Sequence, residues 1–434
     1  MYVVKGVYRT QYMEAMVAVV EKSMYRLMIL LIVGTALAGL FTPEPAEALR
    51  GFLALQWTPS RLIHDFSVTG GPGGALLNAA FMAALALLLV RLNGVRLSGP
   101  TIAGVFTVMG FSLFGKTAAS VLPIAVGVFL AAKSAGKPFR SYIMIALFGS
   151  ALGPLVTGLA LETGLTGFWA VAVGVAGGVA VGFILPGLAM AMLRIHEGYS
   201  LYNIGLTCGF LGLFAAAVLA ASGRDLSVSL IWNLQSSWAM TLIAPAFSAV
   251  LLAWGLVMEG RRALSGFLKI LKLTGRLPSD FLDLVSPGAA LVNMGLLGLA
   301  GSAYVAAVGG EFNGPVVGAL LTLIGFGGFG KHLRNVASVA AGIVVATLLF
   351  GKSLVAPGPL LALLFGTTLA PLAGEFGIGI GFVAGFLHLI LVERTGSWHM
   401  GLDLYNNGFA GGLTAGLLSA GIEWYRSNKR DQAK

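Results

Sequence analysis

The stretch GPTIAGVFTVMGFSLFGK, from Gly99 to Lys116, recurs as GPVVGALLTLIGFGGFGK from Gly314 to Lys331. The two stretches lie 215 residues apart and align without a gap. The same offset relates other landmarks of the two halves, namely Arg61, Asp65, Pro72, Gly73 and Asn78 to Arg276, Asp280, Pro287, Gly288 and Asn293. Chance does not hold one register over such a length, so the chain contains an internal duplication.

Later segments continue the duplication with small shifts in spacing. Leu147 to Ser150 correspond to Leu364 to Thr367 at an offset of 217, and Leu201 to Asn203 correspond to Leu404 to Asn406 at an offset of 203. We therefore divide the chain into a cytoplasmic N-terminal segment (1–24), membrane repeat 1 (25–221), a linker (222–238), membrane repeat 2 (239–421) and a cytoplasmic C-terminal tail (422–434).

The composition defines the class of protein. Of the 434 residues, 57% are hydrophobic and only 10% are charged, whereas charged residues approach a quarter of an ordinary soluble domain. Cys208 is the only cysteine, which excludes a disulfide scaffold. The net charge of +10 comes from basic residues in loops between apolar runs, where they set membrane orientation, so no nucleic-acid partner is expected. The sequence predicts an all-α integral membrane protein.

Each copy contains seven apolar runs that we interpret as membrane elements. They are 25–42, 73–90, 100–115, 119–132, 141–158, 168–193 and 203–221 in the first copy, and 239–258, 288–308, 315–330, 335–350, 358–373, 376–392 and 405–421 in the second. An odd number per copy turns the second copy over in the membrane, which predicts two inverted-topology repeats. The first run resembles a signal peptide, but its long leader contains Glu14 and Glu21, so we interpret it as an uncleaved span.

The charges of equivalent loops support this inversion. Loop 43–72 holds two basic against three acidic side chains, whereas its equivalent, 259–287, holds five basic against three acidic. Basic loops mark the cytoplasmic side. The pattern predicts a multi-pass protein of the cytoplasmic (inner) membrane with both termini in the cytoplasm.

Some elements are too short to cross a bilayer, because a spanning helix needs roughly 20 apolar residues. These are the runs 100–115, 119–132, 315–330 and 335–350. Short broken half-helices at equivalent places in inverted copies are typical of a transport site, since non-helical backbone at membrane depth must be satisfied by protein or water. The alternative is that they are tilted spans whose glycines permit close helix packing.

Lys116 and Lys331 end two of the short segments. If the segments are half-helices that meet near the midplane, both ammonium groups face a shared central cavity and favour an anion or a carbonyl oxygen. If the segments are short spans, both lysines reach the membrane interface and only orient the protein. His332 and Arg334 beside Lys331 favour the interfacial alternative at the second site.

Further polar residues recur at matching positions and complete the candidate substrate-binding set. They are Asn78, Asn293, Asn203, Asn406, Tyr202 and Tyr405, together with Ser150, Thr367 and Thr368, which lie between a glycine and a proline. Polar side chains in a membrane helix either line an aqueous path or join helices. Hydroxyl groups at a Gly–Pro interruption suit an opened helix that presents oxygens to a solute.

The remaining polar residues give little support to enzymatic chemistry. His388 lies in an apolar run, with Ala189 as its expected counterpart, and is interpreted as hydrogen-bonded packing. His399 and Asp403 could share a helix face, but without a third ligand they make a poor metal site. The glycine runs lack a Walker or dinucleotide pattern. We assign no catalytic residue, metal or cofactor.

The duplicated pattern Pro-Gly-x-Ala-Leu-x-Asn, followed by Gly-Pro and Gly-Phe-x-x-Phe-Gly-Lys, resembles a bacterial family of duplicated membrane proteins catalogued as a domain of unknown function. The resemblance covers nearly the whole chain but implies no substrate. In architecture, seven plus seven inverted elements resemble the uracil and sulfate permease fold, and paired short helices resemble urea transporters. Signature residues of both are missing from this sequence, and a fold does not fix a function.

The main hypothesis is a membrane transporter or channel that passes a small polar solute or anion between the two repeats, with membrane lipid as its surroundings. Facilitated passage is favoured over ion coupling, because a coupling ion usually binds a carboxylate within the membrane and the only candidates, Asp65, Asp280 and Asp403, each lie close to a predicted boundary. The alternatives are an ion-coupled secondary transporter of a small metabolite, a membrane-embedded enzyme or lipid-handling protein, and a structural or assembly factor. Flat small-residue faces could also support a homo-oligomer.

Overall fold

The computed structural model describes residues 2–42, 44–224 and 228–431. Throughout these ranges the chain is helical; they contain no β-strand and one isolated bridge, between His64 and Ile231. Nine of the described helical segments are long and apolar enough to cross a membrane: 18–40, 71–92, 139–161, 167–196, 203–221, 238–259, 287–308, 357–376 and 378–398. The predicted class, an all-α multi-pass membrane protein, is confirmed.

With the exception of one short turn, the elements of the first repeat have equivalents in the second. The first repeat contains α1 (Tyr2–Leu40), α2 (Pro45–Leu55), α3 (Phe66–Thr69), α4 (Gly71–Leu92), α5 (Gly99–Phe111), α6 (Ala118–Ser134), η1 (Phe139–Tyr142), α7 (Ile143–Gly149), η2 (Ser150–Leu152), α8 (Gly153–Leu161), α9 (Gly167–His196) and α10 (Asn203–Ala221). The second contains α11 (Trp238–Glu259), α12 (Arg261–Ile270), α13 (Phe281–Leu284), α14 (Pro287–Val308), α15 (Gly314–Phe326), α16 (Leu333–Leu349), α17 (Pro357–Gly366), η3 (Thr367–Leu369), α18 (Ala370–Phe376), α19 (Ile378–Trp398) and α20 (Asn406–Asp431). Only the short turn η1 has no counterpart of its own among the described elements.

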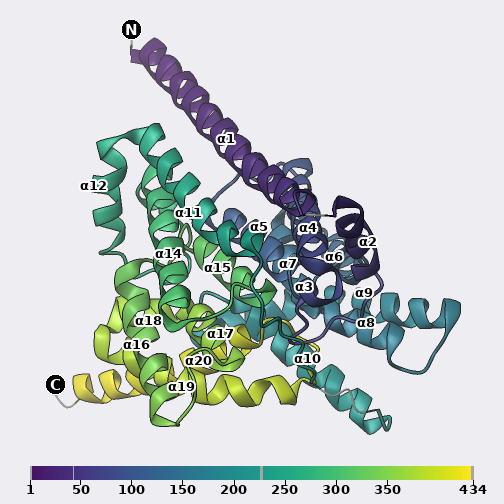
Figure 1. Cartoon of the computed structure of the whole chain (residues 1–434). Helices are drawn as coiled ribbons and strands as arrows, with labels where there is room; N and C mark the ends of the chain where they lie inside the picture. Colours follow the sequence, from purple (N-terminus) through teal and green to yellow (C-terminus); the bar gives the residue numbers. More distant parts are fainter. Residues whose placement is uncertain (1, 43, 225–227, 432–434) are drawn as a thin grey trace.

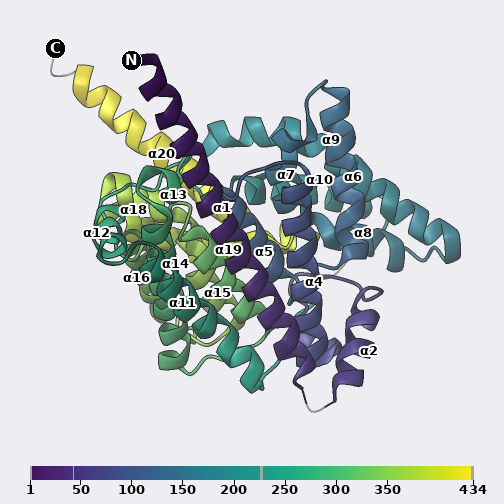
Figure 2. The same ribbon diagram turned by 90° about the horizontal axis from the view of Figure 1, so that it is seen from above.

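The repeats form two adjacent halves, with α5 and α15 between them (Figure 1 and Figure 2). These equivalent helices pack antiparallel. A Cβ at Gly99, where α5 begins, would lie 2.1 Å from the carbonyl oxygen of Gly328, just beyond the end of α15, and one at Gly314 would lie 2.5 Å from that of Leu113. Antiparallel packing of equivalent helices requires a pseudo-two-fold axis perpendicular to them, which is the relationship of inverted repeats.

A second crossing lies at the same axis, between α10 and α20. Gly205 and Gly408 occupy equivalent positions and touch each other, because a Cβ at Gly205 would lie 2.8 Å from the Cα of Gly408. A residue can contact its own equivalent only at the symmetry axis. Glycine is required here because any side chain would separate the two helices.

The short helices are delimited by the same local chemistry. Ser98 and Asn313 cap α5 and α15 through their side chains, and a proline occupies the first turn of each helix. With 13 residues each, the helices are about 20 Å long, less than the bilayer core. Each is followed by a glycine with positive φ, Gly115 at 153° and Gly330 at 122°, where the backbone leaves the helix.

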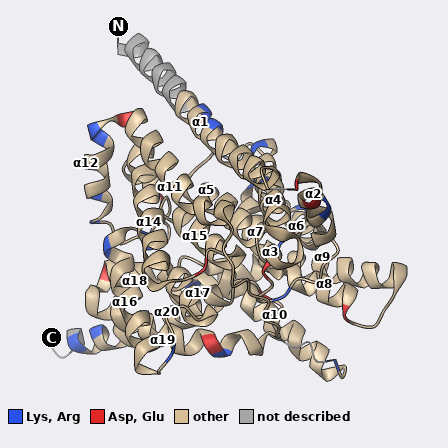
Figure 3. Cartoon of the chain, in the orientation of Figure 1, with Lys and Arg blue, Asp and Glu red and all other residues tan. Residues whose placement is uncertain are grey.

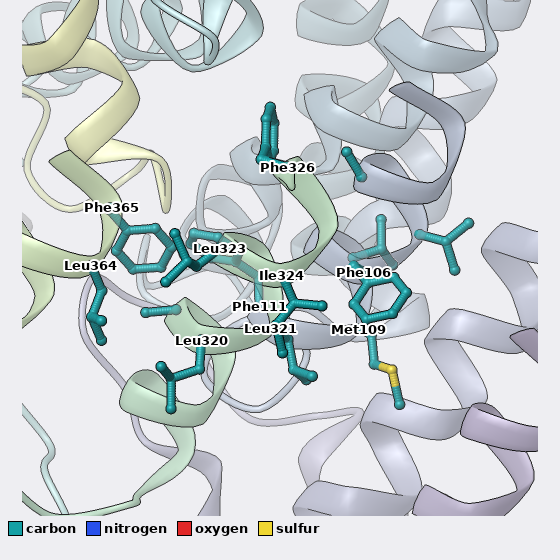
Figure 4. Close-up of a cluster of buried hydrophobic side chains, with 14 of the residues drawn as sticks. Phe106, Met109, Phe111, Leu320, Leu321, Leu323, Ile324, Phe326, Leu364 and Phe365 are labelled. Carbon is teal, nitrogen blue, oxygen red and sulfur yellow. The ribbon is translucent and has the colours of Figure 1, made fainter. Parts of the chain in front are cut away.

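The interface between the two short helices is apolar. Phe106, Met109 and Phe111 of α5 lie near Leu321, Ile324 and Phe326 of α15 (Figure 4). All of these side chains are buried. Burial on every face of α5 and α15 keeps both helices away from lipid and places them at the centre of the protein.

The surroundings suit a bilayer. Large apolar side chains are exposed on the outer helices, for example Phe214, Val218, Val257 and Leu417. Charged residues gather instead at α12, along the end of α20 and in loops (Figure 3). Apolar surface of this kind is stable against lipid tails and unfavourable in water.

Two helices extend beyond the expected segment bounds, and the expected linker pairs with the first repeat. Helix α1 runs without a break from Tyr2 to Leu40, so one helix joins the expected N-terminal segment to the first membrane run. Helix α20 continues to Asp431, ten residues beyond the predicted end of repeat 2 at 421. The expected linker is partly ordered by backbone pairing, since Ile63 and Asp65 donate to Ser229 and Ile231. Hydrogen bonds between segments that are distant in the sequence cannot be predicted from a local sequence pattern.

Candidate functional site at the repeat interface

Lys116 and Lys331 are the most distinctive polar residues of the interior. Both side chains are fully buried at the breaks that follow α5 and α15. Lys116 Nζ donates to Ser150 Oγ at 2.7 Å and to the Tyr405 hydroxyl at 2.5 Å. Lys331 Nζ donates to Thr367 Oγ1 at 2.7 Å and to the Tyr202 hydroxyl at 2.6 Å. Each lysine is therefore held by a hydroxyl group of its own repeat and a tyrosine of the other.

Aromatic rings surround both ammonium groups. Lys116 Nζ lies 4.4 Å from the ring centroid of Tyr405 and 5.3 Å from that of Phe111. Lys331 Nζ lies 4.6 Å from Tyr202 and 5.3 Å from Phe326. These cation–π contacts partly compensate the loss of water around each charge. Both ammonium groups are enclosed by protein, which contradicts the exposed position that the interfacial alternative, with its argument from His332 and Arg334, requires.

Asn78 and Asn293 hold the broken backbone that carries the lysines. The Asn78 amide donates to the carbonyl oxygens of Ser112 and Lys116 at 2.7 and 2.8 Å. Asn293 donates to Gly327 and Lys331 at the same two distances. Backbone groups released by a helix break inside a membrane need such partners. The structure therefore uses both asparagines as supports for the lysines, behind the cavity described below.

Ser150, Thr367 and Thr368 lie where a second pair of helices opens. The turns η2 and η3 interrupt α7–α8 and α17–α18 before a proline, as the Gly–Pro spacing predicts. Thr368 has a different task from its neighbours. Its Oγ1 accepts the backbone N–H of Tyr202 at 3.0 Å and lies 3.2 Å from Ser200 Oγ, so it fixes the loop that presents Tyr202.

A cavity of about 200 Å³ lies on the pseudo-two-fold axis. Its lining is made mostly of equivalent pairs from the two repeats: Thr107 and Thr322, Phe111 and Phe326, Phe148 and Phe365, Leu201 and Leu404, Tyr202 and Tyr405, Gly205 and Gly408. The lysines stand behind the tyrosine and phenylalanine rings and are not on the cavity wall. The expected shared central cavity exists, but the lysines reach it through Tyr202 and Tyr405.

The cavity is not symmetric about the axis. Pro100, at the start of α5, and Phe329, beyond the end of α15, line one side of it. Their equivalents, Pro315 and Phe114, are buried in packing outside the lining of the described cavity. Met144 also contributes to the lining, whereas its equivalent Leu361 is only 4% exposed. The space therefore extends toward the end of the molecule where α5 begins.

Asn203 and Asn406 belong to a repeated His–Asn unit. His196 Nε2 lies 3.0 Å from Asn203 Oδ1, and His399 Nε2 lies 3.2 Å from Asn406 Oδ1. The amide nitrogens of the asparagines donate to backbone carbonyls 14 residues earlier. Asn203 also contributes to the cavity wall, whereas Asn406 is enclosed among these partners. The main role of both units is to fasten α9 to α10 and α19 to α20.

The three acidic candidates fall into two groups, namely two helix-capping residues and Asp403. Asp65 and Asp280 cap α3 and α13, and each also accepts the first backbone N–H of the short helix in the other repeat, at Gly314 and Gly99. They are structural caps. Asp403 is fully buried, as Asp65 is, but it lies in the loop between α19 and α20 and its Oδ2 has no hydrogen-bond partner among the described residues.

Sequence reasoning missed the aromatic lining and one polar pair. The Gly–Phe pairs at 110–111 and 325–326 belong to the repeated motif, but the motif does not indicate that their phenylalanine rings line a cavity. Asn407 lines the cavity, and its Oδ1 lies 3.0 Å from His388 Nε2. Comparison of the two repeats does not predict this pair, because the equivalent of Asn407 is Ile204.

The counterpart assigned to His388 also changes. A Cβ at Gly366 would meet His388, and a Cβ at the equivalent Gly149 would meet Leu185. Leu185, and not Ala189, therefore corresponds to His388. Because one loop is longer in the first repeat, a comparison of α9 with α19 by sequence alone places His388 opposite Ala189.

These features define a class: inverted-repeat, multi-pass membrane proteins with broken helices and a cavity at the repeat interface. The family model described as "Protein of unknown function (DUF1576)" matches residues 44–221 and 259–424, and the chain belongs to this family. Each matched region begins after the first membrane run of a predicted repeat and covers the rest of that repeat, which confirms the resemblance found in the sequence. No curated protein and no solved structure matches the chain.

Proposed function

We propose that this protein transports a small organic anion across the membrane through the axial cavity. The observation that carries the proposal is the pair of buried lysines, each bound to a tyrosine that lines the cavity. A buried cation is costly in a membrane protein and marks a functional site unless it has a charged partner. Lys331 forms no ion pair within the described chain, so its charge is free to attract an anion.

The tyrosine hydroxyl groups transmit the electrostatic effect of the lysines to the cavity. The Tyr202 hydroxyl accepts a hydrogen bond from Lys331, which leaves its own proton for an acceptor in the cavity. A hydroxyl polarised by an ammonium group is a strong donor to an anionic oxygen. This arrangement favours a carboxylate over a neutral amide of the same shape.

The rest of the lining favours a flat or apolar body behind the charge. Phe111, Phe326, Phe148 and Phe365 surround the space, while the hydroxyl groups of Thr107 and Thr322 already donate to carbonyls of their own helices. A volume of about 200 Å³ lies below the roughly 300–1,000 Å³ of sites for drug-sized ligands, so the solute is small. A monocarboxylate such as benzoate has the required size and chemistry.

The inverted repeats supply a route for alternating access. In such proteins the two repeats exchange roles, which closes the site on one side and opens it on the other. The cavity extends toward the end where α5 begins, beside loops 93–98 and 271–280. By the distribution of basic residues this is the cytoplasmic side, which accords with cytoplasmic termini in an inner-membrane protein.

Reconstituted vesicles test the proposal. Uptake of labelled benzoate is compared with uptake of benzamide, its neutral analogue, in vesicles with and without the protein. We expect protein-dependent uptake of benzoate and at least about tenfold less of benzamide, because hydrogen bonds to charged groups are worth about 1.5–3 kcal/mol. A wider panel of small anions, including acetate and nitrate, covers other members of the class.

Two lysine variants provide the matched control. Lys331→Met retains the aliphatic packing and removes the charge, and should abolish benzoate uptake. Lys352→Met removes a partly exposed lysine that pairs with Glu393 and should leave uptake unchanged. Equal uptake by all three proteins, or no flux of any anion above that of empty vesicles, would reject the proposal.

A further inference from the structure

The two lysine sites differ by one acidic group. The residue equivalent to Asp403 in the first repeat is Ser200. Near Lys331, the backbone N–H of Tyr202 is accepted by a neutral hydroxyl, that of Thr368, at 3.0 Å. Near Lys116, the corresponding N–H of Tyr405 is accepted by Asp403 Oδ1 at 2.8 Å. The duplication therefore preserved the geometry and introduced a carboxylate at one site only.

This carboxylate is buried and incompletely bonded. Asp403 has no exposed surface, and its Oδ2 has no hydrogen-bond partner within the described chain. A buried carboxylate normally has all its oxygens satisfied, so the unpartnered Oδ2 of Asp403 leaves a position at which a proton can be held. The repeat does not need the charge for folding, because Ser200 occupies the same position in the first copy.

The groups facing Asp403 come from three elements. Lys116, at the break after α5, and Cys208, on α10, interact with it electrostatically. From the end of α19, His399 Nδ1 accepts the backbone N–H of Asp403. Because Nδ1 is an acceptor and Nε2 faces Asn406 Oδ1, His399 is neutral and contributes no charge. Lys116 is thus the cationic group that faces this carboxylate.

An anion entering near Lys116 and Tyr405 changes the electrostatic balance. Without solute, burial of Asp403 disfavours its charge and the nearby Lys116 favours it. With a bound anion, two negative charges share one ammonium group in a medium of low dielectric constant, which disfavours the ionised carboxylate. Transfer of one proton from solution to Asp403 removes this repulsion, so binding of the anion and binding of the proton favour each other.

We propose that Asp403 is the proton-binding group of an anion–proton symporter, in which one proton enters with each anionic solute. This inference rests on the proposed function and replaces the facilitated passage expected from the sequence. The second site, which has Ser200 in place of the carboxylate, provides positive charge without a coupled proton. Coupling to a cation such as Na⁺ is disfavoured here because Lys116 repels it.

The experiment separates coupled accumulation from exchange. Vesicles that contain the purified full-length protein are given a pH gradient, acidic outside, and accumulation of labelled benzoate is measured. The permeation of benzoic acid through protein-free vesicles is subtracted. In a second assay, exchange of internal for external benzoate is measured at equal pH.

We expect the wild-type protein to accumulate benzoate above the protein-free level under the gradient and to exchange it without one. Asp403→Asn keeps an acceptor oxygen for the Tyr405 N–H and cannot ionise, so it should lose the gradient-driven part and retain exchange. Ser200→Ala, the control at the equivalent position, should retain the gradient-driven part. Asp403→Ser reproduces the residue of the first repeat and serves as the second uncharged variant if Asp403→Asn fails to fold.

Three outcomes would overturn the inference. Gradient-driven accumulation by Asp403→Asn equal to that of the wild type would show that the carboxylate is not the coupling group. Loss of exchange in a folded Asp403→Asn protein would assign Asp403 to solute binding. Exchange by the wild type at equal pH without accumulation under the gradient would show uncoupled transport. Absence of exchange in the wild type would instead reject the proposed function itself.

Discussion

The ammonium group of Lys331 donates to the hydroxyl of Tyr202 at 2.6 Å, and these residues belong to different repeats. Lys116 and Tyr405 form the equivalent bond in the opposite direction across the interface. Each repeat thus completes the polar site of the other. Movement of one repeat against the other must alter both sites together, which is what a transporter with a shared cavity requires.

Removing one tyrosine hydroxyl should weaken transport without unfolding the protein. Tyr202→Phe keeps the ring over Lys331 and deletes the acceptor of a buried charged donor. Since such a bond is worth about 1.5–3 kcal/mol, we expect benzoate uptake to fall about 10- to 100-fold. Tyr304→Phe, on α14 away from the cavity lining, is the control. Unchanged uptake by Tyr202→Phe would remove this hydroxyl from the site.

The glycine crossing at the axis should tolerate no side chain. In Gly205→Ala the new methyl group would lie 2.8 Å from the Cα of Gly408 and would push α10 and α20 apart. Overpacking of this kind costs about 1–3 kcal/mol, which should lower the thermal unfolding midpoint in detergent. Gly187→Ala, in α9, meets nothing within 4 Å and should leave the midpoint unchanged or raised. Equal midpoints would contradict close contact at the axis.

Cysteine labelling should reveal which side of the cavity is open. In a Cys208→Ala background, Met144→Cys lies on the cavity wall and should react quickly with a small thiol reagent. Leu361→Cys occupies the equivalent buried position and should react slowly. Benzoate should protect the first cysteine. Equal reactivity at both positions, before and after addition of benzoate, would contradict a cavity that opens on one side at a time.

The cross-repeat caps should stabilise the fold more than surface ion pairs do. Asp280 accepts the Gly99 N–H with both oxygens, at 3.1 Å each, and also caps α13. Asp280→Ala should lower the free energy of unfolding by about 1–2 kcal/mol. Asp283→Ala removes an exposed pair with Arg96 worth about 0–1 kcal/mol. Thermal unfolding in detergent measures both, and a larger effect at Asp283 would refute the capping role of Asp280.

Comparison of the two repeats predicted more of the site residues than the amino-acid composition did. Comparing the two copies picked out Lys116 with Lys331 and Tyr202 with Tyr405 as equivalent polar residues in apolar surroundings. The same comparison grouped Asn78 and Asn293 with them, although their amides serve the backbone. A sequence pattern shows that a polar residue recurs in a membrane element. The role of that residue depends on its hydrogen-bond partners, which for Asn78 lie 34 and 38 residues away.

The sequence by itself determined the helical class, the two repeats and their inversion, because these follow from the length of apolar runs, an unbroken register and an odd number of elements. Tertiary structure alone decided that α5 and α15 meet antiparallel at an axis, that each lysine bonds to the tyrosine of the other repeat, and that aromatic rings line the space between them. It also distinguished Asp403, whose Oδ2 has no partner among the described residues, from the capping residues Asp65 and Asp280. These outcomes depend on contacts between residues hundreds of positions apart, whose free energies no local pattern of residues encodes.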